Sequence, residues 1–179
     1  LGASRVLDAI IQRLGLPLVV KPSRGGSALG VTLVRSAPEL ARAMVDAFSY
    51  GDTALVECAV EGREVAVSVV EGPDGLRALP GVEIVTDGPY DYDARYNPGR
   101  TEYFTPARLS AAEEAAVATM AMTAHDALGL RHLSRTDLIV DDDGVPHFLE
   151  VNVAPGMTET SLFPQAAAAG GHDLGTMYR

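Results

Sequence analysis

The chain contains 179 residues, 47% of them hydrophobic, which is enough for one core of ordinary size or one core with a small second one. Its net charge of −10, from 14 basic and 24 acidic residues, argues against a general nucleic-acid-binding protein, which would carry a basic face. A single cysteine excludes an intrachain disulfide and no apolar run is long enough to cross a bilayer, so we expect a cytoplasmic protein without a nucleic-acid or membrane partner.

The first third of the chain alternates between helical and strand patterns. Apolar residues on one helical face, followed by Gly15, predict a helix that ends at this glycine. Ser36 and Glu39 have the spacing of a capping box, in which each side chain satisfies the backbone N–H of the other, and a helix should run from there to about Phe48. The predicted order is helix 4–15, strand 16–22, strand 31–34, helix 36–48 and strand 53–60.

The rest of the chain mixes strands with two further helices. Residues 86–107 are polar and aromatic without a clean period, as in functional or disordered loops. Residues 110–129 open with a second capping box, Ser110 with Glu113, and are apolar on more than one side, which predicts a buried helix. Because strands and helices alternate without regular βαβ spacing, we predict an α+β fold with antiparallel sheets. The predicted order is strand 64–70, further sheet over 76–85, loop 86–107, helix 110–129, a hairpin within 134–156 and a short helix over 160–171.

The hairpin carries polar residues at equivalent positions of its two strands. Arg135 and Asp137 lie two apart on the first strand, and Glu150 and Asn152 lie two apart on the second, so each pair shares one face. Like charges opposite each other are unfavourable, so an Asp–Glu pair calls for a cation between them. Arg135 could supply that charge, but a divalent metal also accounts for the asparagine, and two carboxylates with an amide oxygen suit Mg²⁺. A solvent-facing hairpin with one charged side is the alternative.

The alignment of these four residues depends on the turn that joins the strands. The dipeptide Asp143-Gly144 favours a two-residue type I′ turn, which would pair Asp142 with Val145. In that register the two carboxylates lie opposite each other, as do the arginine and the asparagine. Another loop of even length would keep all four on one face, whereas an odd loop would break the arrangement.

A glycine-rich loop between two strands is a second candidate site. The stretch from Lys21 to Gly30 matches neither a Walker A loop nor a Rossmann turn. A flexible hairpin tip with free N–H groups can nevertheless close over phosphates, and Lys21 could reach one of them; an ordinary surface hairpin is the alternative. Arg95 in the long loop could neutralise a terminal phosphate. Carboxylates at a strand end could bind an adenine amino group or ribose hydroxyls: Glu57, Glu61 and Glu64.

Together these motifs resemble the D-alanine–D-alanine ligases of the ATP-grasp superfamily. The resemblance runs from about Leu14 to Tyr178 and rests on GLPLVVKPSRGGSALGV, YDYDARY, SRTDLIV and FLEVNVAPGMTETSLFP, of which the last is the most specific. It implies an ATP-grasp fold, in which two subdomains with antiparallel sheets sandwich ATP. Residues 1–59 would then be part of the lid subdomain, and residues 60–179 a catalytic subdomain truncated at its C-terminus. Family members carry a preceding domain for the first D-alanine, so we expect this chain to be part of a longer protein.

The resemblance also implies roles for individual residues. Lys21 would bind the ATP phosphates, and Glu64 the ribose. Arg135 would stabilise the oxyanion of the tetrahedral intermediate. The implied ATP-binding residues are Lys21, Glu57, Cys58, Val60, Glu64 and Arg95. The implied ligands of two Mg²⁺ ions, which Mn²⁺ could replace, are Asp137, Glu150 and Asn152.

Further residues are implied to hold the second substrate or to close the site. Ser161 would bind the carboxylate of the second D-alanine. Ser27 and Tyr96 would latch the glycine-rich loop to the mobile loop and to the preceding domain. The residues implied for the second D-alanine are Gly156, Ser161 and Leu162.

Three positions depart from the family pattern. Cys58 replaces the adenine-side lysine, and Ala28 replaces a serine that often follows the position of Ser27. Arg95 replaces the lysine expected on the γ-phosphate. This replacement keeps the positive charge, but a guanidinium group differs in shape from an ammonium group. Tyr96 fits the family pattern, and because relatives that form an ester with D-lactate commonly lack this tyrosine, it favours the dipeptide.

The resemblance implies ATP-dependent ligation of two D-alanines for peptidoglycan precursor synthesis. ATP would phosphorylate the carboxylate of the first D-alanine, and the amine of the second would displace phosphate. The intact enzyme would be a homodimer, and this chain alone would be inactive because it lacks the site of the first substrate. The alternatives are an ATP-grasp ligase with another amino-acid or hydroxy-acid acceptor, and a non-catalytic nucleotide-binding fragment.

Overall fold

The computed structural model describes residues 2–86, 101–173 and 175. They form two compact units: the first contains residues 2–59 with residues 86 and 101, and the second contains residues 60–85 with those from 102 onward. Each unit has an antiparallel sheet packed against helices, so the predicted α+β class with antiparallel sheets is confirmed. Within the described ranges, every helix falls short of the length and apolarity needed to span a membrane.

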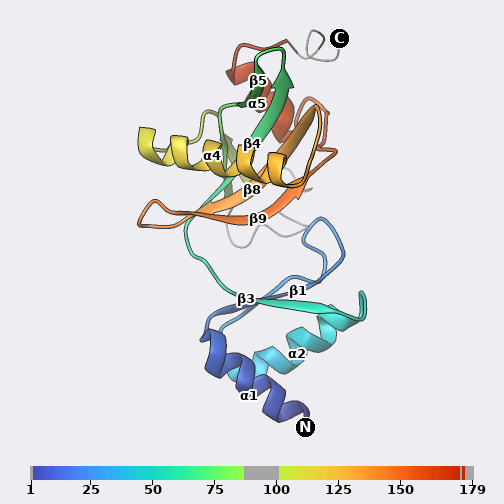
Figure 1. The fold of residues 1–179 in the computed structure, drawn as a ribbon. Coiled ribbons are helices and arrows are strands. Elements are labelled where there is room, and N and C mark those ends of the chain that lie inside the picture. The colour runs from blue at the N-terminus through green and yellow to red at the C-terminus, as the bar shows by residue number, and fades with distance from the viewer. Residues whose placement is uncertain (1, 87–100, 174, 176–179) are drawn as a thin grey trace. The chain divides into compact units, whose positions relative to one another are not determined.

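The first unit is a three-stranded sheet, in the order β2-β1-β3, with two helices on one face (Figure 1). Alternate residues of β1, Leu18 and Val20, are fully buried against Leu40 and its neighbours on the second helix. The first helix ends at its C-cap Gly15, which has a φ of 78°, so the predicted helix end at this glycine is confirmed. The elements of this unit are α1 (Ala3–Leu14), β1 (Leu18–Pro22), β2 (Thr32–Val34), α2 (Ala37–Phe48) and β3 (Ala54–Cys58).

The capping box predicted at the start of α2 is wrong. The Ser36 hydroxyl caps no backbone N–H and instead donates to Oε1 of Glu39 at 2.6 Å. The other carboxylate oxygen of Glu39 accepts the backbone N–H of Arg35 at 2.9 Å, and these bonds, that from Ser36 foremost, lower the pKa of Glu39. The reason is local: Pro38 has no N–H to offer, and the N–H of Glu39 already donates to the Ser36 carbonyl oxygen.

The second unit is a larger antiparallel sheet in the order β7-β6-β4-β8-β9, with β5 paired to β4. The segment predicted as one continuation over 76–85 is two strands, separated at Leu79 to Gly81. A strand also lies within the predicted loop 86–107, where residues 101–104 pair at the sheet edge. The elements are β4 (Arg63–Gly72), β5 (Gly75–Ala78), β6 (Val82–Thr86), β7 (Thr101–Phe104), α4 (Ala111–Ala127), β8 (Leu133–Val140), β9 (Pro146–Asn152) and α5 (Leu162–Ala169).

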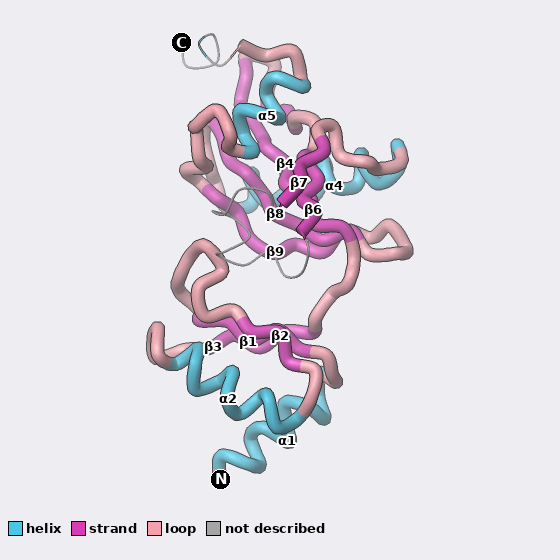
Figure 2. Tube along the Cα trace, turned by 180° about the vertical axis from the view of Figure 1, so that it is seen from behind, coloured by secondary structure: helices cyan, strands magenta, loops and turns pink. Residues whose placement is uncertain are grey.

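Helices α4 and α5 lie on opposite faces of this sheet (Figures 1 and 2). The predicted capping box at the start of α4 is confirmed: Ser110 Oγ accepts the N–H of Glu113, and Glu113 Oε2 accepts the N–H of Ser110. The prediction that α4 is a buried helix is wrong, because its buried residues follow a single stripe against β4 and β8. That stripe is Val117, Ala121 and His125.

Candidate active site

Strand alternation divides the sheet of the second unit into two faces. Val65 and Val67 of β4 pack with Leu138 of β8 in the core beneath α4. Residues at the alternate positions therefore point to the opposite face. In the β4–β8 register, Ala66 pairs with Asp137, and the buried Ser68 pairs with Arg135 on the same face. This face carries the predicted polar residues of the unit: Glu64, Arg135, Asp137, Glu150 and Asn152.

The β8–β9 hairpin has a different turn from the predicted one. Its loop is three residues long: the N–H of Asp141 donates to the Val145 carbonyl oxygen at 3.1 Å, and the N–H of Gly144 donates to the Asp141 carbonyl oxygen at 3.0 Å. Gly144 has a φ of 80°, which completes a type I turn followed by a left-handed residue. Oδ1 of Asp141 holds this turn by accepting the N–H groups of Asp143 and Val145. The predicted pairing of Asp142 with Val145 is therefore wrong.

A β-bulge compensates for the odd loop before the site is reached. Leu138 pairs with Phe148 and Asp137 pairs with Glu150, so Leu149 is an extra residue on β9. Without it, Glu150 would turn to the face beneath α4. The expected opposition of the two carboxylates, and of the arginine and the asparagine, is confirmed, but it arises from an odd loop plus a bulge.

Asp137 is the most enclosed carboxylate of this face, and its residue is 3% exposed. The Arg135 guanidinium binds both of its oxygens, with Nε at 2.7 Å from Oδ1 and Nη2 at 2.8 Å from Oδ2. The Asn152 side-chain amide donates to Oδ2 at 3.2 Å. A buried carboxylate needs such partners because burial without them is costly. Arg135 thus supplies compensating positive charge beside Asp137 in this structure.

The donor set on this face fits a divalent metal by its chemistry. Among the described residues, no group of three or more His, Cys, Asp or Glu side chains gathers as a metal site would. The predicted set is instead Asp137, Glu150 and Asn152, two carboxylates and an amide, which the β8–β9 register brings to neighbouring positions. Hard oxygen donors of this kind suit Mg²⁺, which completes its coordination with water and phosphate oxygens.

In the first unit, two predicted ATP-binding residues form an ion pair on the sheet face that points away from the helices. Lys21 Nζ lies 2.5 Å from Oε2 of Glu57. The two residues sit diagonally on neighbouring strands, because Lys21 pairs in register with Leu55 and Glu57 pairs with Val19. The exposed Cys58 is the last residue of β3, and its thiol donates to the Leu14 carbonyl oxygen at 3.3 Å. Val60 follows β3, outside any strand.

The glycine-rich loop joins β1 to β2. Ser27 and Ala28 adopt left-handed φ values of 55° and 56°, which is uncommon for residues with a side chain. The N–H of Leu29 donates to the Gly26 carbonyl oxygen at 3.2 Å, so the tip of the loop is a tight turn. The other predicted members of this closure, Arg95 and Tyr96, lie outside the described residues.

The residues predicted for the second substrate lie where α5 begins. Ser161 immediately precedes α5, and its hydroxyl caps none of that helix's N–H groups. Gly156 lies so close to it that an added Cβ would be 2.7 Å from Ser161 Oγ. Leu162 is 7% exposed and belongs to the buried side of α5 with Phe163. A side chain at position 156 would therefore displace the serine hydroxyl.

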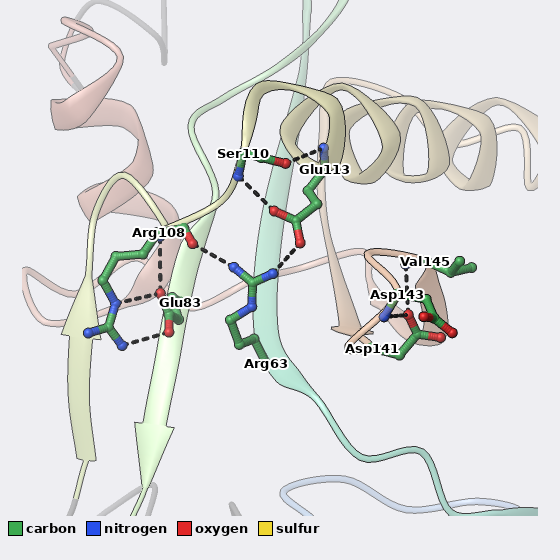
Figure 3. A network of polar contacts seen from close by, with 8 residues as sticks. All are labelled: Arg63, Glu83, Arg108, Ser110, Glu113, Asp141, Asp143 and Val145. Carbon is green, nitrogen blue, oxygen red and sulfur yellow. Dashed lines mark hydrogen bonds and ion pairs between the residues drawn. The ribbon is translucent and has the colours of Figure 1, made fainter.

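A polar network joins β4, β6 and the start of α4 (Figure 3). Glu83, 2% exposed, accepts from Arg108 Nε at 2.9 Å and Nη2 at 2.7 Å, which lowers its pKa. Arg63 donates to the Arg108 carbonyl oxygen at 2.5 Å and to the Glu113 carboxylate, whose pKa is lowered mainly by the N–H of Ser110. Glu83 and Arg108 are 25 positions apart in the sequence, and Arg63 and Glu113 are 50 positions apart. No short motif therefore predicts this network.

Comparison with known proteins defines the class. Residues 2–178 match the family model described as D-ala D-ala ligase C-terminus. The chain is 44% identical over 165 residues to the D-alanine--D-alanine ligase of Nitrosospira multiformis, covering 92% of this chain and 53% of that relative. VanG D-Ala:D-Ser ligase from Enterococcus faecalis has a TM-score of 0.85 and 33% identity, over 97% of this chain and 50% of VanG. The Bacillus anthracis D-alanine--D-alanine ligase complexed with ATP has a TM-score of 0.74 and 30% identity, over 90% and 50%.

The fold and the shared sequence place the chain among the ATP-grasp proteins, as the resemblance implied. Within that class, the chain belongs to the family of D-Ala-D-Ala ligase C-terminal domains. It spans about half the length of the curated relatives it matches.

Proposed function

We propose that this chain is the C-terminal part of a cytoplasmic, homodimeric D-alanine–D-alanine ligase that makes D-alanyl-D-alanine for peptidoglycan precursors. The observation that carries the proposal is one sheet face on which the β8–β9 register aligns Asp137 with Glu150 and Arg135 with Asn152. In the proposed organisation, residues 1–59 belong to the lid subdomain and residues 60–179 to the catalytic subdomain. Family membership supports the same assignment.

The proposed reaction has two steps. A carboxylate oxygen of the first D-alanine attacks the γ-phosphorus of ATP and ADP leaves, which gives an acyl phosphate. The amine of the second D-alanine attacks the acyl carbon, loses a proton, and expels phosphate as the peptide bond forms. Both steps concentrate negative charge on oxygen atoms, so residues that neutralise that charge should dominate catalysis.

The chain offers residues for each of these tasks. Asp137, Glu150 and Asn152 would hold two Mg²⁺ ions, or Mn²⁺, and such ions supply charge neutralisation at the phosphate oxygens. Arg135 would stabilise the oxyanion that develops at the acyl carbon. Lys21 would contact the ATP phosphates. The remaining proposed ATP ligands are Glu57, Cys58, Val60, Glu64 and Arg95, and the proposed acceptor and closure residues are Gly156, Ser161, Leu162, Ser27 and Tyr96.

Asn152→Ala in the full-length protein tests the metal assignment. We expect the Mg²⁺ concentration that gives half-maximal ADP release to rise, and kcat/KM to fall at least about tenfold, because an oxygen ligand is lost. Asp142→Asn is the matched control, since it alters the tip of the same hairpin outside the proposed site and should leave both quantities unchanged. Full activity and an unchanged Mg²⁺ requirement in Asn152→Ala would overturn the assignment.

Ligation to a different acceptor is the second candidate function. It is favoured by the likeness to VanG, which is a D-Ala:D-Ser ligase. The two functions share the phosphoryl-transfer step and differ only in the second substrate. Product analysis of the full-length protein with ATP, Mg²⁺ and D-alanine, with D-serine or D-lactate added as a competing acceptor, decides between them, because the acceptor with the highest kcat/KM gives the most abundant product at equal concentrations.

A further inference from the structure

Thr158 forms a hydroxyl pair with Ser161 just before α5. Thr158 Oγ1 lies 2.7 Å from Ser161 Oγ, and the backbone N–H of Thr158 donates to the same oxygen at 3.2 Å. The N–H of Ser161 in turn donates to the Thr158 carbonyl oxygen at 2.8 Å. The two residues are therefore tied to each other by backbone and side chain.

The hydrogen-bonding capacity of these groups limits what Ser161 can do. A hydroxyl has one proton to donate and two lone pairs to accept. The backbone N–H of Thr158 occupies one lone pair of Ser161 Oγ. If the Thr158 hydroxyl donates into the other, Ser161 Oγ is filled as an acceptor, and its own proton remains for a third group. That third group must be an acceptor, and a carboxylate is the strongest one among amino-acid substrates.

We infer that Thr158 is a positioning residue for the acceptor amino acid: its hydroxyl fixes Ser161 as a hydrogen-bond donor to the acceptor's carboxylate. This inference rests on the proposed function, which assigns Ser161 to that carboxylate. Gly156 contributes by leaving space, because an added Cβ there would sit 2.7 Å from Ser161 Oγ. In this arrangement Thr158 acts through Ser161 and does not itself touch the substrate.

The test is the steady-state kinetics of full-length Thr158→Val, which replaces the hydroxyl by a methyl group of similar shape. We expect KM for the acceptor D-alanine to rise about three- to tenfold, the effect of weakening one hydrogen bond to a charged group. KM for ATP should not change, since Thr158 acts only on the acceptor side. Thr158→Ser keeps the hydroxyl and should restore the wild-type acceptor KM.

A double-mutant cycle separates positioning from a general structural effect. If Thr158 acts through Ser161, Thr158→Val should add nothing to the acceptor KM in a Ser161→Ala background. An effect of equal size in both backgrounds, or an unchanged acceptor KM in Thr158→Val, overturns the inference while the proposed function stands. Absence of D-alanine-dependent turnover in the wild-type protein overturns the proposed function and the inference with it.

Discussion

At the scale of single residues, buried charges in the second unit are compensated by arginines. Glu83 is 2% exposed on β6 and is bound through both oxygens by Arg108, and Asp137 is bound in the same way by Arg135. The two pairs differ in surroundings. The guanidinium carbon of Arg108 lies 3.7 Å from the centroid of the Phe104 ring, and the Glu83–Arg108 pair belongs to the polar network at the start of α4. The Asp137–Arg135 pair instead lies on the sheet face of the proposed site. We therefore expect the first pair to matter for stability and the second for activity.

Glu83→Gln tests the stabilising pair through its pH dependence. Because the Arg108 hydrogen bonds lower the folded-state pKa of Glu83, the ionised carboxylate stabilises the fold above its unfolded-state pKa, and this contribution is lost as pH falls through the folded-state pKa. At pH 7 we expect the variant to lose about 1–2 kcal/mol of unfolding free energy. The difference from wild type should shrink in urea titrations below about pH 4.

The matched control for this experiment is Glu159→Gln, which removes a carboxylate at an exposed position in the same unit. Its unfolding free energy should stay within about 0.5 kcal/mol of wild type at pH 7. A Glu83→Gln variant that is as stable as this control, or one whose deficit grows as the solution is acidified, contradicts the stabilising role of the pair.

At the scale of elements, two serines with the same capping-box spacing behave differently. Ser110 accepts the N–H of Glu113 at the start of α4, but Ser36 accepts no N–H at the start of α2. Ser110→Ala should therefore cost about 1 kcal/mol of local helix stability, and Ser36→Ala less than about 0.5 kcal/mol. Hydrogen exchange of the first-turn amides of each helix measures both, and equal effects would show that the two caps are equivalent.

Local patterns predicted most elements but not how strands are aligned. Apolar periodicity placed the helices and the central strands, because those patterns report directly on which face is buried. The turn at Asp142–Gly144 and the bulge at Leu149 were not predictable, since Asp141 holds the turn by side-chain bonds and the bulge breaks the two-residue alternation. The three-residue loop and the bulge each shift the register by one residue, and the two shifts cancel, so Asp137 pairs with Glu150 as predicted.

The candidate site was predictable to the extent that it lies in short motifs. The polar residues of the hairpin and the glycine-rich loop carry fixed spacings, so they stand out in the sequence. The Lys21–Glu57 ion pair and the Glu83–Arg108 pair join residues that are far apart in the sequence, so motif spacing cannot predict them. The contact between Thr158 and Ser161 was not predictable, because a threonine three residues before a serine does not by itself indicate that the two hydroxyls meet.

At the scale of the whole molecule, the chain spans about half the length of the curated relatives it matches. Each unit has its own buried core, one built around Leu18, Val20 and Leu40, the other around Val65, Val67 and Leu138. The proposed residues for ATP, metal and acceptor are distributed over both units. The first substrate has no assigned residues in the chain, so the proposed function requires a further segment, and the 179-residue chain alone should form no dipeptide.

The most direct test of the central claim is product analysis with ATP, Mg²⁺ and D-alanine, using the full-length protein and the 179-residue chain side by side. We expect the full-length protein to form D-alanyl-D-alanine and ADP in equal amounts and only when D-alanine is present, and the chain alone to form no dipeptide. Dipeptide synthesis by the chain alone would contradict the division of labour between segments. ADP release by the full-length protein without dipeptide, or no D-alanine-dependent ADP release at all, would contradict the claim that this is a D-alanine–D-alanine ligase.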